Sequence, residues 1–227
     1  MIIWIASYPK SGNTYLRAFL ASYYYSEEGK FNFNYLSNIK QFPNLKFSKF
    51  QARTKEEASQ NWIFNQNEFF KKENFNLTKT HNCLYPFKGN QFTSSNLSLG
   101  AIYIVRDPRN VITSLTHHYS LNYEQALHHM TNEQSSLLET TVDDDYSNFT
   151  YLSSWANHYK SWKNNSIFKT LFVKFEDFQN NKEETFRKIV LFIKKLTKDD
   201  SYINETKFLN SIKTTNFTNL KNKELNE

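Results

Sequence analysis

The stretch that decides the fold of this 227-residue chain is Ser7-Tyr8-Pro9-Lys10-Ser11-Gly12-Asn13-Thr14. It follows a short apolar run at residues 2–6, Ile-Ile-Trp-Ile-Ala, which predicts a buried strand. From about residue 13 the apolar side chains are spaced to form one face of a helix. A strand, a tight loop and a helix N-terminus together form a phosphate-binding geometry, because the first helical amides lack partners and the helix dipole is positive there.

The side chains of this loop favour an anion as its ligand. Lys10 adds a full positive charge, Gly12 lets the backbone approach a ligand, and Ser11, Asn13 and Thr14 add short polar groups at the helix start. The loop is not a Walker A motif, G-x-x-x-x-G-K-[ST], because its lysine precedes the glycine. The sequence therefore gives little support to a nucleotide triphosphatase. The alternative to an anion-binding loop is an ordinary strand–turn–helix whose lysine faces solvent.

A second strand is predicted at residues 76–81, Asn-Leu-Thr-Lys-Thr-His. Because side chains alternate along a strand, Lys79 and His81 share one face. A histidine near a strand end is more often structural or exposed than catalytic. In open α/β sheets, however, ligands bind outside the carboxyl ends of the strands, and His81 lies at such an end.

The third strand, residues 101–105, is continuous and apolar, as a strand covered on both faces should be. Arg106 follows it, and a helix begins with Asp107 as the cap and Pro108 in the first turn. Arg106 offers a planar fork to a phosphate, and Ser114 lies eight residues further along the helix.

The rest of the chain completes an α/β pattern. Helices are predicted at residues 56–70 and 152–162, the latter with a core-facing stripe, and a fourth strand at residues 171–175. Glu176-Asp177 is expected to cap an amphipathic helix at residues 183–196. We therefore predict a single domain over residues 1–227, a three-layer α/β sandwich with a central, mostly parallel sheet.

Residues 118–150 are polar and rich in histidine and asparagine, and we expect a variable loop near the acceptor pocket. The pairs His117-His118 and His128-His129 are adjacent in sequence, so their side chains project about 100° apart on a helix. Neither pair forms a chelating face, and we predict no metal site.

The net charge of +6 favours anionic partners, but the lysines are scattered, so we expect no nucleic-acid surface. The single cysteine, Cys83, excludes an internal disulfide framework. No apolar run approaches the ~20 residues of a membrane span. The first strand begins without a charged leader, and we expect a cytoplasmic protein. The oligomeric state has no sequence signature here.

Two of these motifs resemble those of the sulfotransferases that use 3′-phosphoadenosine 5′-phosphosulfate (PAPS) as donor. Tyr8–Thr14 resembles the family's 5′-phosphosulfate loop, and Arg106–Ser114 its 3′-phosphate motif. Weaker likenesses are Lys174–Asp177, with Phe175 where the family often has tyrosine, and Thr214–Phe217, which is similar to the segment whose aromatic ring packs on adenine. The resemblance implies a P-loop nucleotide-kinase-like fold.

The resemblance also implies the chemistry. PAPS is the co-substrate, the product is adenosine 3′,5′-bisphosphate (PAP), and no metal takes part. Lys10 meets the bridging oxygen of the leaving phosphate, Lys79 the sulfuryl oxygens, and His81 takes the acceptor proton as a free imidazole that needs no large tuning. The acceptor is a small molecule or glycan with a hydroxyl or an amine. The implied cofactor-binding residues are Lys10, Ser11, Gly12, Asn13, Thr14, Tyr15, Arg106, Ser114 and Phe217.

Two departures qualify the resemblance. Tyr15 stands where the family usually has tryptophan, and the chain ends at Glu227, where many relatives continue into an Arg-Lys-Gly element that also holds the 3′-phosphate. We expect either a truncated sequence or a 3′-phosphate held by fewer groups. The alternatives are a nucleotide or small-molecule kinase and a non-catalytic polyanion-binding relative. The sulfotransferase hypothesis requires the loop that carries Lys10 and the Arg106 side chain to be neighbours in space.

Overall fold

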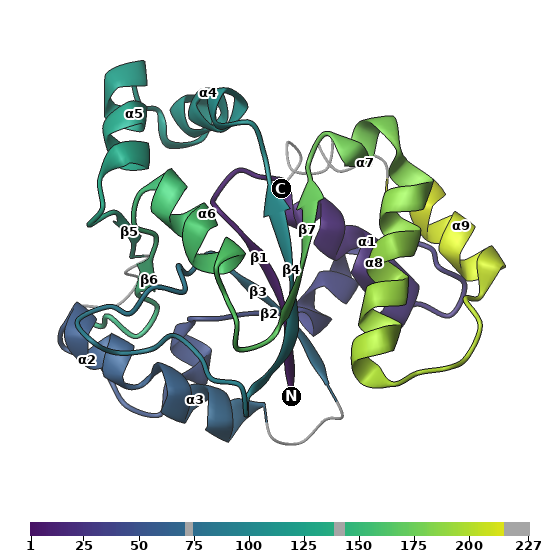
Figure 1. Ribbon diagram of the computed structural model, residues 1–227, viewed down its shortest axis with the longest axis horizontal. Coiled ribbons are helices and arrows are strands. Elements are labelled where there is room, and N and C mark those ends of the chain that lie inside the picture. The colour runs from purple at the N-terminus through teal and green to yellow at the C-terminus, as the bar shows by residue number, and fades with distance from the viewer. Residues whose placement is uncertain (71–74, 139–143, 216–227) are drawn as a thin grey trace.

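The computed structural model describes residues 1–70, 75–138 and 144–215. A five-stranded, fully parallel sheet in the order β2-β3-β1-β4-β7 lies between two layers of helices (Figure 1). Its strands are β1 (Ile2–Ser7), β2 (Lys40–Gln41), β3 (Asn76–Thr80), β4 (Ser98–Val105) and β7 (Lys169–Lys174). A short antiparallel pair is formed by β5 (Ser136–Leu137) and β6 (Thr150–Tyr151).

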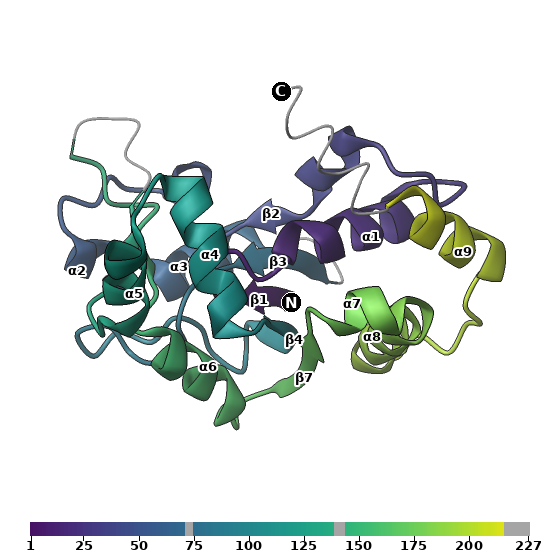
Figure 2. The same ribbon diagram turned by 90° about the horizontal axis from the view of Figure 1, so that it is seen from above.

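The helices fall into two groups on either side of the sheet (Figures 1 and 2). The first group is α1 (Asn13–Tyr25), α7 (Asp177–Asn180), α8 (Lys182–Thr197) and α9 (Glu205–Thr214). The second is α2 (Lys55–Gln60), α3 (Trp62–Phe69), α4 (Pro108–Tyr119), α5 (Tyr123–Thr131) and α6 (Trp155–Lys163). Two 3-10 turns, η1 (Phe33–Asn38) and η2 (Leu45–Phe47), flank β2.

The central strand β1 is buried on both faces, which explains its unbroken apolar sequence. Ile3 and Ile5 pack in the core shared with α1, α8 and α9, whereas Ile2 and Trp4 belong to the core on the opposite face. Each fully buried side chain of this size contributes about 1.5–3 kcal/mol of transfer free energy. The alternation fixes the register of β1. It therefore also fixes the position of the loop that follows, residues 8–12, which we call the Lys10 loop.

Parallel pairing brings the functional loops together at one edge of the sheet. β1 lies between β3 and β4, with Ala6 opposite Thr80 and Ser7 opposite Ile104. The chain therefore leaves three neighbouring strands at the same level, at the loop after Ser7, at His81 and at Arg106. The predicted α/β sandwich and all four predicted strands are confirmed.

Three local predictions were wrong. The helix expected at residues 56–70 is two helices that meet at Asn61. The described part of residues 118–150 adjoins the main cleft at the carboxyl edge of the sheet, but it is not a single loop: it holds α5, which a complete capping box of Asn122 and Gln125 starts, and the strands β5 and β6. Glu176 and Asp177 do not cap α8, whose N-cap is Asn181; the Glu176 carboxylate instead accepts a hydrogen bond from the Asp107 amide at 3.3 Å.

The stripe predicted on residues 152–162 faces the core as expected. Trp162 is fully buried, Tyr159 is partly buried in the same cluster, and Trp155 is partly buried against a neighbouring cluster that contains Tyr8. Within the described ranges, no helix has the length and apolar character needed to cross a membrane. The same part of the chain contains no group of three or more His, Cys, Asp or Glu side chains arranged to hold a metal ion.

Candidate active site

A cleft of about 460 Å³ opens at the carboxyl edge of the sheet. The ends of β2, β3, β1, β4 and β7 all contribute to its walls, through Gln41, Lys79, the Lys10 loop, Arg106 and Phe175. Of the residues predicted from sequence, the cleft is lined by Lys10, Gly12, Asn13, Thr14, Tyr15, Lys79, His81, Arg106 and Ser114. Ser11 is buried beneath the loop, and Phe217 lies outside the described residues.

The charge of the cleft suits a polyanion. Lys10, Lys79 and Arg106 line it, and no carboxylate does so within the described residues. Helix α1 adds its positive end, because its N-cap Gly12 makes no side-chain capping bond and its first turn holds no acidic residue. The unpaired amides and the positive dipole at this helix end favour binding of an anion.

The Lys10 loop is held in an unusual backbone conformation. Lys10 and Gly12 both have positive φ, at 63° and 93°, and such strain in a residue with a side chain clusters at functional sites. The Ser11 hydroxyl is buried without a hydrogen-bond partner in the described part of the chain. A buried polar group left unpaired is costly, so this loop fits a ligand that supplies acceptor oxygens.

Replacing Gly12 by alanine should destabilise the protein by about 2–5 kcal/mol. A left-handed conformation costs an L-residue about 1–2 kcal/mol, and overpacking adds about 1–3 kcal/mol. The added Cβ would lie 2.3 Å from Cδ2 of Phe175. Urea unfolding measures the loss. Gly89→Ala is the matched control, since its φ is 84° but nothing lies within 4 Å of the added Cβ. Equal losses in both variants would contradict a role for the Phe175 contact.

Arg106 joins the two loops that the sequence predicted to be neighbours. Its Nη1 donates a hydrogen bond to the Lys10 carbonyl at 2.8 Å. The guanidinium lies 4.5 Å from the centre of the Phe175 ring, a cation–π contact. Its Nε is buried without a partner among the described residues, and burial lowers the pKa of Arg106. Arg106 and the Lys10 loop therefore form one continuous, positively charged wall of the cleft.

His81 is oriented by the backbone of β1. Its Nδ1 lies 2.7 Å from the Ser7 carbonyl, which accepts only, so Nδ1 carries the proton and the lone pair of the neutral ring is on Nε2. Burial, and then the charge of Lys79, hold the pKa of His81 well below its usual value. The prediction of an imidazole that needs no tuning was therefore wrong: the ring is kept neutral and unprotonated at Nε2.

Asn13 links the Lys10 loop to this histidine. Its Nδ2 donates to the Ile5 carbonyl at 3.0 Å and to the Ser7 hydroxyl at 3.2 Å, and that hydroxyl lies 3.3 Å from Nδ1 of His81. The amide of Asn13 thus faces inward, toward the strand. In this structure it braces the loop and the imidazole ring of His81.

A second histidine, His158, contacts the backbone of His81. It was not predicted from the sequence. Its Nε2 lies 2.9 Å from the His81 carbonyl and its Nδ1 2.8 Å from the Tyr103 hydroxyl. Burial lowers the pKa of His158 to about 4, so it is a neutral structural histidine. The only sequence signal for it was a polar residue on the inner face of α6. Its partners, His81 after β3 and Tyr103 in β4, are distant in sequence.

Tyr15 is mostly buried and packs against Phe178 and Phe186, with ring centres 5.6 Å away in both cases. Beside it lies a second hollow of about 220 Å³, which the main cleft adjoins at Tyr15 and Phe175. Gln179 and Lys182 complete this hollow.

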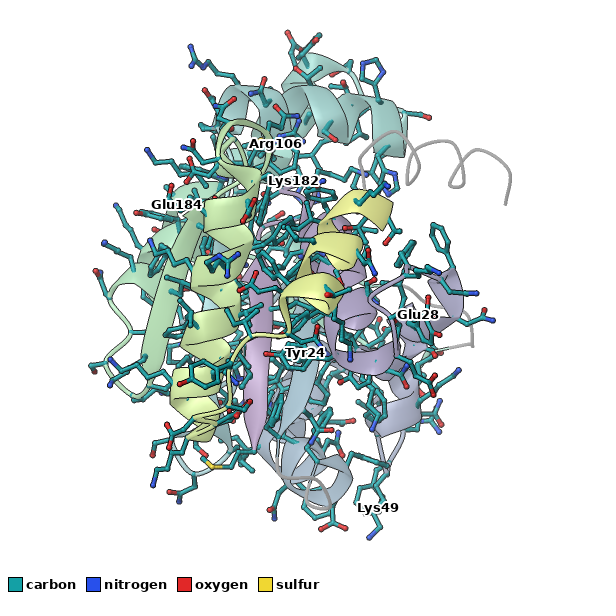
Figure 3. All side chains as sticks on the ribbon, turned by 90° about the vertical axis from the view of Figure 1, so that its right-hand side faces the viewer. Tyr24, Glu28, Lys49, Arg106, Lys182 and Glu184 are labelled. Carbon is teal, nitrogen blue, oxygen red and sulfur yellow. The ribbon has the colours of Figure 1, made fainter. Side chains whose placement is uncertain are left out.

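Lys182 places its Nζ 5.6 Å above the Tyr15 ring and donates to the Ile212 carbonyl at 2.8 Å. Figure 3 shows Lys182 and Arg106 at the same end of the molecule. Gln179 and Lys182 were not predicted, because the turn through α7 that presents them had no distinct sequence signature.

Comparisons with known proteins agree with this geometry. The family model described as "Sulfotransferase domain" matches residues 2–227. The solved structure of mouse sulfotransferase SULT7A1 complexed with PAP has a TM-score of 0.58 at 18% identity, over 96% of this chain and 65% of that one. Retinol dehydratase, in a complex with retinol and PAP, has a TM-score of 0.50 at 18% identity, over 97% of this chain and 66% of that one.

This chain therefore spans about two thirds of the length of those solved proteins. At such identities the two structures establish the likeness of fold. No curated protein matches the chain.

Proposed function

The chain belongs to the sulfotransferase domain family, and we propose that it transfers the sulfuryl group of PAPS to a hydroxyl or an amine of a small-molecule or glycan acceptor. The single observation that supports this most is the contact of Arg106 with the Lys10 loop, which makes one cationic wall at the edge of the sheet. PAPS carries a 5′-phosphosulfate and a 3′-phosphate on its ribose, and a continuous cationic wall can contact both groups.

The residues present fit the nucleotide. The Ser11 hydroxyl and the Arg106 Nε are buried donors that lack partners in the described chain, and such groups suit phosphate oxygens. We assign the 5′-phosphosulfate to Lys10, Gly12 and Thr14, together with the open end of α1, and the 3′-phosphate to Arg106 and Ser114.

The hollow beside Tyr15 is then the place of the adenine ring. Its walls, Tyr15, Phe175 and Phe178, are aromatic, and aromatic faces stack on nucleobases. Lys182 adds hydrogen-bond donors at the rim. Phe217, proposed from sequence for the same task, stays a prediction.

In the proposed reaction, the PAPS bound in the cleft supplies the sulfuryl group. His81 takes the acceptor proton on Nε2 while the acceptor oxygen or nitrogen bonds to sulfur and the bond from sulfur to the 5′-phosphate oxygen breaks. Lys10 neutralises the charge that develops on that leaving oxygen, and Lys79 the charge on the sulfuryl oxygens. The protein's part is positioning and electrostatics, as in phosphoryl transfer.

Titration calorimetry tests the cofactor class. We expect the protein to bind PAP at least ~10-fold more tightly than AMP or ATP, because an extra charge-assisted phosphate contact contributes more than about 1.4 kcal/mol. A preference for ATP with Mg²⁺ would indicate the kinase alternative. Binding of any polyanion with a steep salt dependence and no preference for PAP would indicate the non-catalytic relative.

A further inference from the structure

Gln41, on the edge strand β2, contacts Lys79, one of the proposed catalytic lysines. Its Oε1 accepts a hydrogen bond from the Lys79 Nζ at 2.8 Å. A lysine ammonium has donors only, so the amide oxygen must face it, and this fixes the orientation of the Gln41 amide. Both residues line the cleft.

The pairing is built into the sheet. Gln41 stands opposite Lys79 in the register of β2 and β3, and the Phe42 amide donates to the Lys79 carbonyl at 2.9 Å. Paired residues of neighbouring parallel strands project from the same face, with the strands about 4.8 Å apart, which brings the two side chains together. The position of Gln41 therefore follows from backbone pairing as well as from its side-chain bond.

A partly buried arginine secures this short strand. Nη2 of Arg17, from α1, donates to the Ile39 carbonyl at 3.2 Å and to the Leu36 carbonyl at 3.4 Å, immediately before β2. Burial lowers the pKa of Arg17 to about 10. A two-residue edge strand has few ladder bonds of its own, and these bonds tie it to the helix that carries the phosphate loop.

We propose that Gln41 is a positioning residue that aims the Lys79 ammonium at the transferred sulfuryl group. A flexible lysine has about 2 kcal/mol of rotamer entropy to lose when it binds, and a neutral acceptor restrains the ammonium in advance without cancelling its charge. A carboxylate at this position would neutralise Lys79. The inference rests on the proposed function, since it needs PAPS as the ligand.

Binding of PAPS and of PAP, measured by calorimetry without an acceptor, tests this proposal. Gln41→Met keeps the length of the side chain and removes its acceptor. We expect the Kd for PAPS to rise about 5–10-fold, the upper range of what one ordinary intramolecular hydrogen bond contributes, because Lys79 itself stays in place and only its restraint is lost. The Kd for PAP should stay within about twofold, because PAP has no sulfuryl group. The control is Lys40→Met on the same strand, whose Nζ lies 5.8 Å above the Phe70 ring; it should change neither value.

A double-mutant cycle distinguishes positioning from direct contact or from a structural role. In a Lys79→Met background, adding Gln41→Met should change the Kd for PAPS by less than about twofold. A full further loss in that background, an equal loss for PAP and PAPS, or no effect of Gln41→Met alone overturns the proposal. If the unmodified protein has no preference for PAP over AMP, the proposed function itself fails, a result that the Gln41 variants do not produce.

Discussion

His81→Asn should slow sulfuryl transfer by about 10²–10⁴-fold, the usual contribution of a general base. The asparagine amide can replace the Nδ1 donor to the Ser7 carbonyl, so the loop keeps its support while the Nε2 base is lost. The affinity for PAP should stay within about twofold. The assay is single-turnover transfer from ³⁵S-labelled PAPS to an acceptor selected from a panel of alcohols, phenols and sugars.

The pH dependence gives an independent check of the same residue. A general base acts in its unprotonated form, and the pKa of His81 lies well below its usual value. The acid limb of kcat/KM should therefore lie below pH ~6.5, and it should be absent in His81→Asn. The exposed His117 on α4 provides the control, and His117→Asn should match the parent protein in rate and profile. Transfer at the parent rate by His81→Asn would exclude His81 as the base.

Arg106→Met should weaken PAP binding by about 30-fold or more, and it should abolish the preference for PAP over AMP. Removing one partner of a hydrogen-bonded charge pair typically costs about 2–5 kcal/mol, at about 1.4 kcal/mol for each factor of ten. Loss of the bond to the Lys10 carbonyl should also weaken AMP binding, but less, because AMP lacks the 3′-phosphate. Calorimetry with both nucleotides measures the two effects together.

A matched control lies three residues away. Arg109, in the first turn of α4, has an 88% exposed side chain that pairs with the N-cap residue Asp107. Arg109→Met removes an equal charge from the outside of the loop, and it should change the Kd for PAP by less than about threefold, since exposed charges are screened. Arg106→Lys keeps the charge without the planar fork and should fall between the two variants. Comparable losses in Arg106→Met and Arg109→Met would mean that only net charge matters.

Most of the fold was predictable because its signals are local. The apolar run of β1, the turn chemistry around Gly12 and the Asp107-Pro108 helix start each depend on neighbouring residues. The errors have local causes as well. Asn61 separates two helices that a periodicity argument joins, and the capping box of α5 was hidden in a segment rich in polar residues.

The sequence by itself determined which loops follow which strands, and so which charged side chains reach the carboxyl edge of the sheet. Strand polarity sends Lys10, His81 and Arg106 to one edge. The resemblance to the sulfotransferase motifs then identified them, with Lys79, as site residues.

How these side chains are held and protonated depends on contacts between elements that are distant in the chain. The Phe175 ring beneath Arg106, the Gln41 acceptor at Lys79 and the His158 support of His81 come from segments distant in sequence. The depressed pKa of His81 is likewise a consequence of burial and of a neighbouring charge. Hydrogen bonds and desolvation depend on distances of a few ångströms between packed elements, and no local pattern in the chain encodes those distances.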